Sequence, residues 1–415
     1  MAQLSDDCFA FGGKLLPIED AIEMIVSRVT PLESLETVPL SLADGRILAR
    51  DFVAPISLPP FTNSAVDGYA VAHADLGDAD VALPVAGRIE AGAMTFAHLP
   101  GTATRIFTGA AMPDGADTVF MQEDVRVEGE LAHLPAGLKR GANVRPAGED
   151  IAIGEVALAK GRRLVPQDVA LAAALGATEL VVAKPVRVAV FSTGNELVSP
   201  GERQSPPQIY DSNRFMLLAL LGRLGCDAHD LGILRDDRAG LARALKKAAS
   251  EFDLIITSGG VSTGEADHVK AAVESIGSLV FWRMAIKPGR PVAMGVIEGT
   301  PFVGLPGNPV ASYVTQAYVV RPLALALMGA CWTPAPPVPV RAAFSYKKKS
   351  GRREFVRVSV ATAADGLLEA RKFPREGAGL LTSLTQTHGL AVLGEGVTRV
   401  EPGDQVGFMN YAVLM

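Results

Sequence analysis

A repeating alternation of apolar runs and helical patterns between Val186 and Val320 constrains the fold of this 415-residue chain more than any other feature. Apolar runs such as VRVAVF, HDLGIL and DLIIT alternate with segments of helical periodicity such as DSNRFMLLALLGRLG and DDRAGLARALKKAASEF. We expect Asp211 or Ser212 to cap the first of these helices. Strands that alternate with helices of this length favour a parallel, doubly wound sheet. The sequence therefore predicts an α/β domain over residues 186–333.

The flanking segments have different patterns. Helical spacing of apolar residues in PIEDAIEMIVSRV predicts an amphipathic helix near the N-terminus, and PQDVALAAALG predicts a second helix. Between them, residues 54–146 consist of short β-rich pieces separated by glycine and proline turns. The prolines of CWTPAPPVPV predict a stiff linker, and the strand-like segments of residues 334–415 predict a small C-terminal β-barrel or sandwich.

Composition and charge exclude several functional classes. Hydrophobic residues make up 48% of the chain and charged residues 20%, as in globular proteins. No basic run interleaved with aromatic residues is present, so we predict no nucleic-acid binding. Cys8, Cys226 and Cys331 form no C-x-x-C pair, and the N-terminus lacks a signal-peptide pattern. The most apolar stretch, AYVVRPLALALMG, is interrupted by Arg321 and Pro322, so we predict no membrane span and a cytoplasmic protein.

Polar residues follow the predicted strands of the α/β domain, where ligands bind in open parallel sheets. Glu196 follows the first strand, Asp236 and Asp237 the second, and the loop TSGGVSTGEADHVK the third; KPGRP and GLPGNPV follow later strands. Each has a structural alternative: Asp237 could cap a helix, and Asn308 with Pro309 is a good helix start. Taken together, the acids, glycines and cations predict a polyanion site in which a hard cation bridges carboxylates and phosphates.

Six spaced motifs carry a resemblance to a known family over nearly the whole chain. These are SLPPFTNSAVDGYAV, RIFTGAAMPDGADTVFMQED, STGNEL, TSGGVSTGEADHVK, AIKPGRP and GLPGNPV. The chain resembles the molybdopterin molybdenumtransferases of the MoeA family, which are related to the C-terminal part of gephyrin. The resemblance implies an enzyme of molybdenum cofactor biosynthesis. Its substrates would be molybdate and adenylylated molybdopterin, and AMP would be released with Mg²⁺ as cofactor.

The resemblance also implies roles for individual residues. Catalytic roles fall to Asp67, Glu196, Asp236 and Asp267, of which Glu196, Asp236 and Asp267 would also contact Mg²⁺. The residues implied to bind substrate are Thr108, Ser258, Gly259, Gly260, Lys270, Arg283, Lys287, Arg290, Pro306, Pro309 and Arg357. In one departure from the family pattern, Ala378 occupies the usual position of a serine; Thr382 or Ser383 could supply the missing hydroxyl.

Family members are similar to one another in forming elongated dimers of four-domain subunits. For this chain the resemblance implies a discontinuous N-terminal domain (1–53 and 147–185), a β-rich module (54–146), the molybdopterin-binding α/β domain (186–333) and a C-terminal β-barrel (334–415). The cleft would lie between the sheet domain of one subunit and the barrel of the other, and an adenylyltransferase could dock nearby. Two alternatives stay open: adenylyltransferase activity, or a nonenzymatic molybdopterin-binding scaffold.

Overall fold

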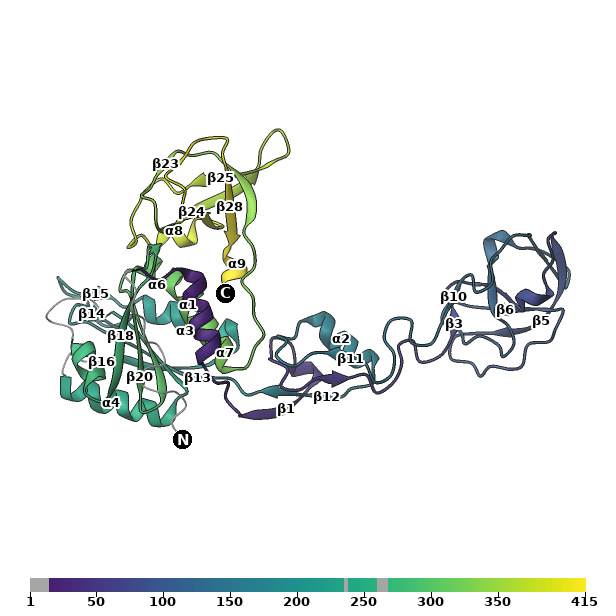
Figure 1. The fold of residues 1–415 in the computed structure, drawn as a ribbon, viewed down its shortest axis with the longest axis horizontal. Coiled ribbons are helices and arrows are strands. Elements are labelled where there is room, and N and C mark those ends of the chain that lie inside the picture. Colours follow the sequence, from purple (N-terminus) through teal and green to yellow (C-terminus); the bar gives the residue numbers. More distant parts are fainter. Residues whose placement is uncertain (1–14, 235–237, 260–267) are drawn as a thin grey trace.

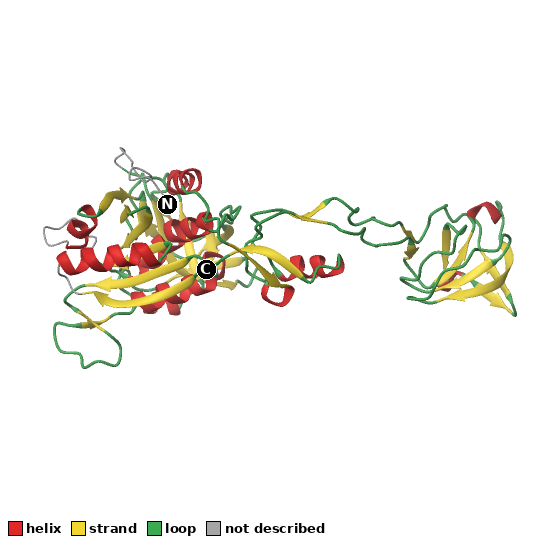
Figure 2. Ribbon diagram, turned by 90° about the horizontal axis from the view of Figure 1, so that it is seen from below, coloured by secondary structure: helices red, strands yellow, loops and turns green. Residues whose placement is uncertain are grey.

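The computed structural model describes residues 15–234, 238–259 and 268–415 of an elongated molecule. One end holds the α/β sheet and the C-terminal barrel, and a narrow arm leads to a separate β-rich module at the other end (Figure 1). A view from below shows the same separation between the two ends (Figure 2). Residues 235–237 and 260–267, which include Asp236, Gly260 and Asp267, lie outside the described residues.

The α/β domain is built on a sheet with the strand order β16-β13-β17-β21-β20-β18. The first four strands are parallel, as expected from the alternating pattern, whereas β20 runs antiparallel to β21 and β18 antiparallel to β20. Short connections between consecutive strands produce this antiparallel edge, because they leave no room for a crossover helix. The strands span Arg187–Thr193 (β13), Asp227–Leu234 (β16), Leu254–Ser258 (β17), Gly277–Arg283 (β18), Pro291–Ile297 (β20) and Thr300–Leu305 (β21).

Helices cover both faces of this sheet. Along β13, Val188 and Val190 belong to one core, whereas Ala189 and Phe191 belong to another, because successive side chains point to opposite faces. The first core lies under α1, α3, α6 and α7, and the second under α4 and α5. These helices span Ile18–Arg28 (α1), Asn213–Leu224 (α3), Arg238–Glu251 (α4), His268–Glu274 (α5), Pro309–Thr315 (α6) and Arg321–Leu327 (α7).

Arg321 and Pro322 interrupt the apolar stretch of the sequence, but they do not end the helix. A π-helical turn, Gln316–Val320, joins α6 directly to α7, so residues 309–327 form one continuous helix. Proline lacks the N–H that an α-helical bond would need, and such a wider turn accommodates the change in hydrogen bonding. Within the described residues this helix is long and apolar enough to span a membrane, but 94% of its most apolar window is buried inside the protein. It therefore packs as a core helix.

The C-terminal region contains a closed five-stranded barrel, as predicted. Its strands pair in the order β24-β25-β22-β28-β26, and β26 pairs back with β24 to close the ring. They span Val338–Ala342 (β22), Arg353–Thr362 (β24), Leu368–Lys372 (β25), Gly389–Leu393 (β26) and Gln405–Asn410 (β28); Tyr346–Lys347 (β23), Arg399–Val400 (β27), Thr382–Thr385 (α8) and Tyr411–Leu414 (α9) complete the region. A two-residue strand from the α/β domain, β19 (Ile286–Lys287), adds to β24 in parallel.

The arm and the β-rich module complete the chain. In the arm, antiparallel pairs join β1 (Leu35–Pro39) to β12 (Glu179–Ala183) and β2 (Phe52–Val53) to β11 (Val156–Leu158), beside α2 (Pro166–Ala174). Next, β3 (Asn63–Ser64) pairs with β10 (Val144–Arg145). The module's sheet has the order β7-β4-β6-β5-β9-β8. Its strands span Gly68–Val71 (β4), Val81–Ile89 (β5), Ala103–Ile106 (β6), Thr118–Met121 (β7), Arg126–Glu128 (β8) and Leu131–Leu134 (β9).

Candidate functional site: two adjoining pockets

A cleft of about 330 Å³ lies at the carboxyl ends of the parallel strands, where the polar strand exits were predicted to converge. The described residues that line it come from the ends of β13, β17 and β21, the short strands β14 (Leu197–Val198) and β15 (Ile209–Tyr210), the starts of α3 and α6, and a segment of the barrel domain. They are Thr193, Glu196, Leu197, Ile209, Tyr210, Asp211, Ser212, Asn213, Ser258, Gly259, Gly307, Asn308, Pro309, Gly379 and Leu381. The predicted residues Glu196, Ser258, Gly259 and Pro309 are therefore together in one site.

Gly259 forms the tight turn at the end of β17. Its φ is +88°, in the left-handed region that residues with a side chain rarely adopt. A Cβ placed there would lie 2.9 Å from the Thr193 carbonyl oxygen. The Gly259 N–H donates to the Leu305 carbonyl at 3.1 Å. This position needs glycine because the exits of three neighbouring strands approach one another closely here.

Asn213 joins two of these strand exits. Its Nδ2 donates to Ser258 Oγ at 2.9 Å and to the Gly307 carbonyl oxygen at 2.7 Å. Asn213 is 7% exposed and Ser258 is 3% exposed, so these bonds are made largely away from water. The first residue of α3 thus fixes the loop after β17 relative to the loop after β21.

A buried ion-pair network anchors the start of α3 behind the cleft. The Arg214 guanidinium donates to Asp211 Oδ2 at 2.8 Å and also pairs with Asp230 on β16. Burial alone would lower the pKa of Arg214, but the hydrogen bonds to Asp211 and Asp230 raise this pKa above its ordinary value. Asp211 Oδ1 also accepts the Arg214 N–H at 3.3 Å, so Asp211, one of the two expected caps, supplies the capping contact; the Ser212 side chain makes none.

Glu196 lies at the exposed side of the cleft, after β13. A Cβ on Gly194, whose φ is +146°, would lie 2.5 Å from Glu196 Oε2, so the glutamate side chain folds back over the glycine. Among the described residues, no hydrogen bond or ion pair engages the Glu196 carboxylate. That carboxylate is available to a hard cation, which prefers oxygen ligands of this kind. Within the described ranges, no group of three or more His, Cys, Asp or Glu side chains could hold a metal ion.

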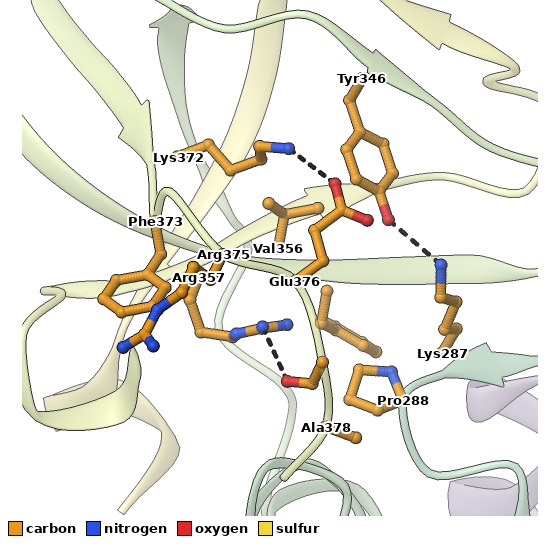
Figure 3. A pocket seen from close by; sticks show the side chains of 12 residues that line it. Lys287, Pro288, Tyr346, Val356, Arg357, Lys372, Phe373, Arg375, Glu376 and Ala378 are labelled. Atoms are coloured by element: carbon orange, nitrogen blue, oxygen red, sulfur yellow. Dashed lines mark hydrogen bonds and ion pairs between the residues drawn. The ribbon is translucent and has the colours of Figure 1, made fainter. Parts of the chain in front are cut away.

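A second pocket, of about 130 Å³, lies beside the cleft and has the opposite charge character (Figure 3). Lys287, Arg357, Lys372 and Arg375 are among its lining residues, and Glu376 is the acid among the described lining residues. Lys372 Nζ pairs with Glu376 Oε1 at 2.7 Å. The remaining lining residues are Pro288, Tyr346, Phe355, Val356, Phe373, Gly377 and Ala378. Such an excess of cations at a small pocket is suited to an oxyanion.

Contacts within the barrel domain hold Arg357 in place. Its Nε donates to Ser383 Oγ at 3.1 Å, and its terminal nitrogen donates to the Gly377 carbonyl at 3.0 Å. Burial lowers the pKa of the Arg357 guanidinium from its ordinary value. Ser383 is fully buried, and its hydroxyl already donates to the Leu380 carbonyl at 2.6 Å, so it does not replace the hydroxyl missing at Ala378. The exposed Thr382 begins α8 and lines neither pocket.

Lys287 lines the cationic pocket and also forms an ion pair at the junction between the sheet and the barrel. Its Nζ lies 3.3 Å from Glu354 Oε2, and the Tyr346 hydroxyl donates to the same oxygen at 2.8 Å. Glu354 is 1% exposed, and its other oxygen accepts from Arg352 Nε at 2.8 Å. Burial raises the pKa of the Glu354 carboxyl, but the bonds from Tyr346 and Arg352 and the charge of Lys287 outweigh it and lower this pKa.

The two pockets share a wall. Ala378 lines the cationic pocket and Gly379 lines the cleft, so the segment Gly377–Gly379 separates them. The Val310 N–H in α6 donates to the Ala378 carbonyl at 3.0 Å, which attaches this segment to the helix that starts at the cleft. A Cβ on Gly379 would lie 3.6 Å from Asn308 Oδ1. Within a single chain, the barrel therefore already contributes to the cleft of its own sheet domain.

Other predicted residues lie elsewhere. Arg283 ends β18 and Arg290 precedes β20, so both are at the edge where the parallel strands end, although neither lines the two pockets. Pro306 follows β21 at the same edge. Lys270 on α5 pairs with Glu274 at 3.9 Å and lies over the Phe281 ring at 5.7 Å, and it does not line the cleft.

Asp67 and Thr108 form a pair in the distant β-rich module. Asp67 Oδ1 accepts the Thr108 N–H at 2.8 Å and the Thr108 hydroxyl at 2.7 Å. These two bonds hold the pKa of the Asp67 carboxyl below its usual value. Because the module lies at the far end of the arm (Figure 1), one chain does not bring this pair to its own cleft.

Several lining residues were missed from the sequence. Asn213 and Asn308 have the pattern of helix starts, and Tyr346, Lys372 and Arg375 lie in strand-like or turn segments of the barrel without a motif. The signal for Asn213 was weak, because capping also explains a polar side chain at the start of a helix. The barrel residues gave no comparable signal, since their position depends on contact with a distant domain.

Comparison with known proteins agrees with this arrangement. Three family models match consecutive parts of the chain: the MoeA N-terminal region (domain I and II) at residues 16–176, a probable molybdopterin binding domain at residues 189–326, and the MoeA C-terminal region (domain IV) at residues 339–411. The molybdopterin molybdenumtransferase of Haemophilus influenzae is 38% identical over 398 residues, covering 94% of this chain and 98% of that protein. The chain belongs to the MoeA family.

Further relatives extend the similarity to three dimensions. The molybdopterin molybdenumtransferase of Nostoc sp. is 36% identical, covering 94% of this MoeA-family chain and 92% of its own. A crystal structure of a molybdopterin biosynthesis MoeA protein from Pyrococcus horikoshii matches with a TM-score of 0.81 and 29% identity, over 96% of this chain and 100% of that one. A second structure of a molybdopterin biosynthesis MoeA protein from this organism gives a TM-score of 0.74 and 33% identity, over 96% and 99%.

Proposed function

We propose that this MoeA-family protein is a molybdopterin molybdenumtransferase of molybdenum cofactor biosynthesis. It would insert molybdenum from molybdate into adenylylated molybdopterin and release AMP. The observation that supports this reaction best is the cationic pocket directly beside the strand-end cleft, with one wall shared between them. A reaction that joins a small oxyanion to a larger organic ligand needs two such sites in contact.

In this proposal molybdate occupies the cationic pocket. Lys287, Arg357, Lys372 and Arg375 would neutralise the oxyanion, and the Arg357 guanidinium is held in place by Ser383 and the Gly377 carbonyl. The pterin nucleotide would occupy the cleft, which Ser258, Gly259 and Pro309 line, with Pro306 nearby after β21. Arg283 and Arg290, at the same edge of the sheet, would approach the phosphates; Lys270 and Gly260 stay predictions from the family pattern.

Magnesium is the cofactor that we propose for phosphate activation. The Glu196 carboxylate, which has no side-chain partner among the described residues, fits a hard cation. Asp236 and Asp267 remain its predicted companions outside those residues. When bound, Mg²⁺ would neutralise the pyrophosphate and make its phosphorus easier to attack. The protein's own residues would orient the nucleotide and hold the oxyanion beside it.

We also propose that the active form is a homodimer. Asp67 and Thr108 are predicted site residues, yet their module lies at the end of the arm opposite the cleft of the same chain. A second chain could bring this pair to the cleft, whereas the barrel wall is already present in the same chain. Docking of an adenylyltransferase and a cytoplasmic location are further proposals.

The deciding experiment measures AMP release from adenylylated molybdopterin by the purified protein, with molybdate and Mg²⁺ each added or withheld. We expect AMP only when both are present, with molybdenum retained on the pterin. Chelation of Mg²⁺ should abolish release, and its replacement should restore it. Release without molybdate would contradict the transferase. AMP formation would rule out a nonenzymatic scaffold, and failure to adenylylate free molybdopterin with ATP would rule out the adenylyltransferase alternative.

A further inference from the structure

The orientation of the Asn213 carboxamide is determined by its neighbours. The Gly307 carbonyl can only accept a hydrogen bond, so the atom 2.7 Å from it must be the amide nitrogen of Asn213. The second hydrogen of that nitrogen is directed to Ser258 Oγ at 2.9 Å. With both donor hydrogens engaged, the carboxamide oxygen is the group that Asn213 can still offer.

That oxygen is buried without a partner. Asn213 Oδ1 has almost no exposed surface and accepts no hydrogen bond from the described residues. The residue lines the cleft and is 7% exposed. Thr193 lines the same cleft and is 2% exposed, and its hydroxyl likewise has no hydrogen-bond partner in the part of the chain that the structure describes. Buried acceptors are rarely left unpaired, because their loss of hydration is then uncompensated. An unpaired acceptor at a cleft therefore indicates a ligand that donates.

The rest of the lining indicates which kind of donor. Among the described residues that line the cleft there is no Lys, Arg or His, whereas acceptors such as Glu196 and Asn308 are present together with apolar side chains of Leu197 and Leu381. The neighbouring pocket, in contrast, gathers cations. This part of the cleft therefore suits a flat ring carrying an uncharged N–H donor.

We infer that Asn213 is a specificity-determining residue whose Oδ1 accepts a hydrogen bond from an amino group on the heterocycle of the substrate. This inference rests on the proposed placement of the pterin nucleotide in the cleft. Two rings of that substrate carry such an amino group, the pterin at its 2-position and the adenine at its 6-position. Either amino group could donate a hydrogen bond to Asn213 Oδ1, which can only accept one.

The test uses pairs of ligands that exchange this amino group for an oxo group. Calorimetric titration of the wild-type protein compares 6-methylpterin with 6-methyllumazine, and AMP with IMP. We expect the amino member of one pair to bind about tenfold or more tightly than its oxo partner, because the oxo group opposes an acceptor. The pair that shows this preference identifies the ring. Equal affinities within both pairs would overturn the inference without any mutation.

Two variants distinguish recognition of the ligand by Asn213 Oδ1 from the role of Asn213 in holding the loops after β17 and β21. Asn213→Ala should reduce the ratio of affinities for the amino and oxo ligands to nearly one. Ser258→Ala breaks the bond to Asn213 Nδ2 but retains Asn213 Oδ1 and the bond to Gly307, so this ratio should stay at its wild-type value. Loss of the preference in both variants would assign it to loop geometry and contradict the role of Oδ1. Failure of the wild type to bind either amino ligand would also overturn this inference. If AMP release nevertheless depends on molybdate, the proposed function survives that failure; if AMP release is also absent, both fail.

Discussion

At the residue scale, the position of Arg357 in the cationic pocket depends on Ser383, which does not itself line that pocket. Ser383 is a buried residue of α8; it accepts the Arg357 Nε–H, while its own hydroxyl donates to the Leu380 carbonyl. The guanidinium is thereby held at the pocket with one bond from a side chain and one from the Gly377 carbonyl. Ser383 thus fixes the orientation of the Arg357 guanidinium. We expect its loss to weaken oxyanion binding more than it lowers the stability of the fold.

We expect Ser383→Ala to raise the molybdate KM for AMP release severalfold and to lower the free energy of unfolding by about 1 kcal/mol. The arginine would lose one anchor while the pocket keeps its charge. The matched control is Thr382→Ala, which removes a neighbouring hydroxyl exposed to solvent, and its KM should stay at the wild-type value. An unchanged molybdate KM in Ser383→Ala would contradict the anchoring role.

Gly259→Ala should abolish AMP release and destabilise the α/β domain. The new Cβ would meet the Thr193 carbonyl at 2.9 Å, in addition to the strain of a positive φ. Gly176→Ala is the control, because Gly176 has a similar φ of +84° but nothing within 4 Å of the added Cβ. We expect the control to cost about 1–2 kcal/mol in urea unfolding and to keep its activity. Equal losses in the two variants would show that backbone strain alone matters.

The strand pattern indicated Glu196 and the loop that contains Ser258 and Gly259, because ligands bind at the carboxyl ends of parallel strands. The family resemblance implied the binding roles of these residues and of Pro309. The role of Ser383 as an anchor of Arg357 and the role of Asn213 as a bridge between loops were not predicted, for different physical reasons. Ser383 acts through an arginine 26 positions away in the sequence. Asn213 looks like a helix start, and its bridge to Gly307 spans 94 positions. Local patterns do not encode such long-range contacts.

At the element scale, the joint between sheet and barrel is a two-residue strand secured by a buried acid. β19 adds to β24, and Glu354, at the register position paired with Lys287, collects bonds from Tyr346, Arg352 and Lys287. The alternation of strands and helices predicted the sheet and its helices, and turn-rich β segments predicted the barrel. The antiparallel edge was missed, although only Glu298 and Gly299 connect β20 to β21 and such a short connection is typical of an antiparallel pair. The pairing of β19 with β24 was not predictable, because the sequence does not identify its distant partner.

Glu354→Gln should make stability less sensitive to acid. The folded pKa of Glu354 is lowered, so its contribution is fully present above the unfolded pKa of about 4.3 and is lost as the pH falls through the folded value. At pH 7 we expect the variant to lose about 2 kcal/mol in urea unfolding. The difference between variant and wild type should shrink as the pH falls below about 4. A difference that is constant with pH would contradict the charged role of Glu354.

At the scale of the whole molecule, the arm separates two parts of one predicted site. The Asp67–Thr108 pair belongs to the β-rich module, and Glu196 belongs to the cleft at the other end (Figure 1). The family pattern indicated both groups of residues from the sequence alone. It could not indicate the separation, since that depends on the course of the arm, and the proposed homodimer follows from it.

Mixing two inactive variants tests whether the site is assembled from two chains. Asp67→Asn and Glu196→Gln should each be inactive alone and keep their folds. After subunit exchange of equal amounts, half of the dimers are mixed and each mixed dimer has one intact site, so about a quarter of wild-type AMP release should return. No recovery, with mixed dimers verified by mass spectrometry, would show that each chain uses its own module.

The wall Gly377–Gly379 has a thermodynamic consequence. It faces molybdate on one side and the pterin nucleotide on the other in the proposed function, and it is attached to α6 through the Val310 N–H. A ligand that shifts this wall alters the affinity of both pockets. Cooperativity between the two substrates must then be reciprocal: whatever factor molybdate contributes to the binding of the nucleotide, the nucleotide contributes equally to the binding of molybdate.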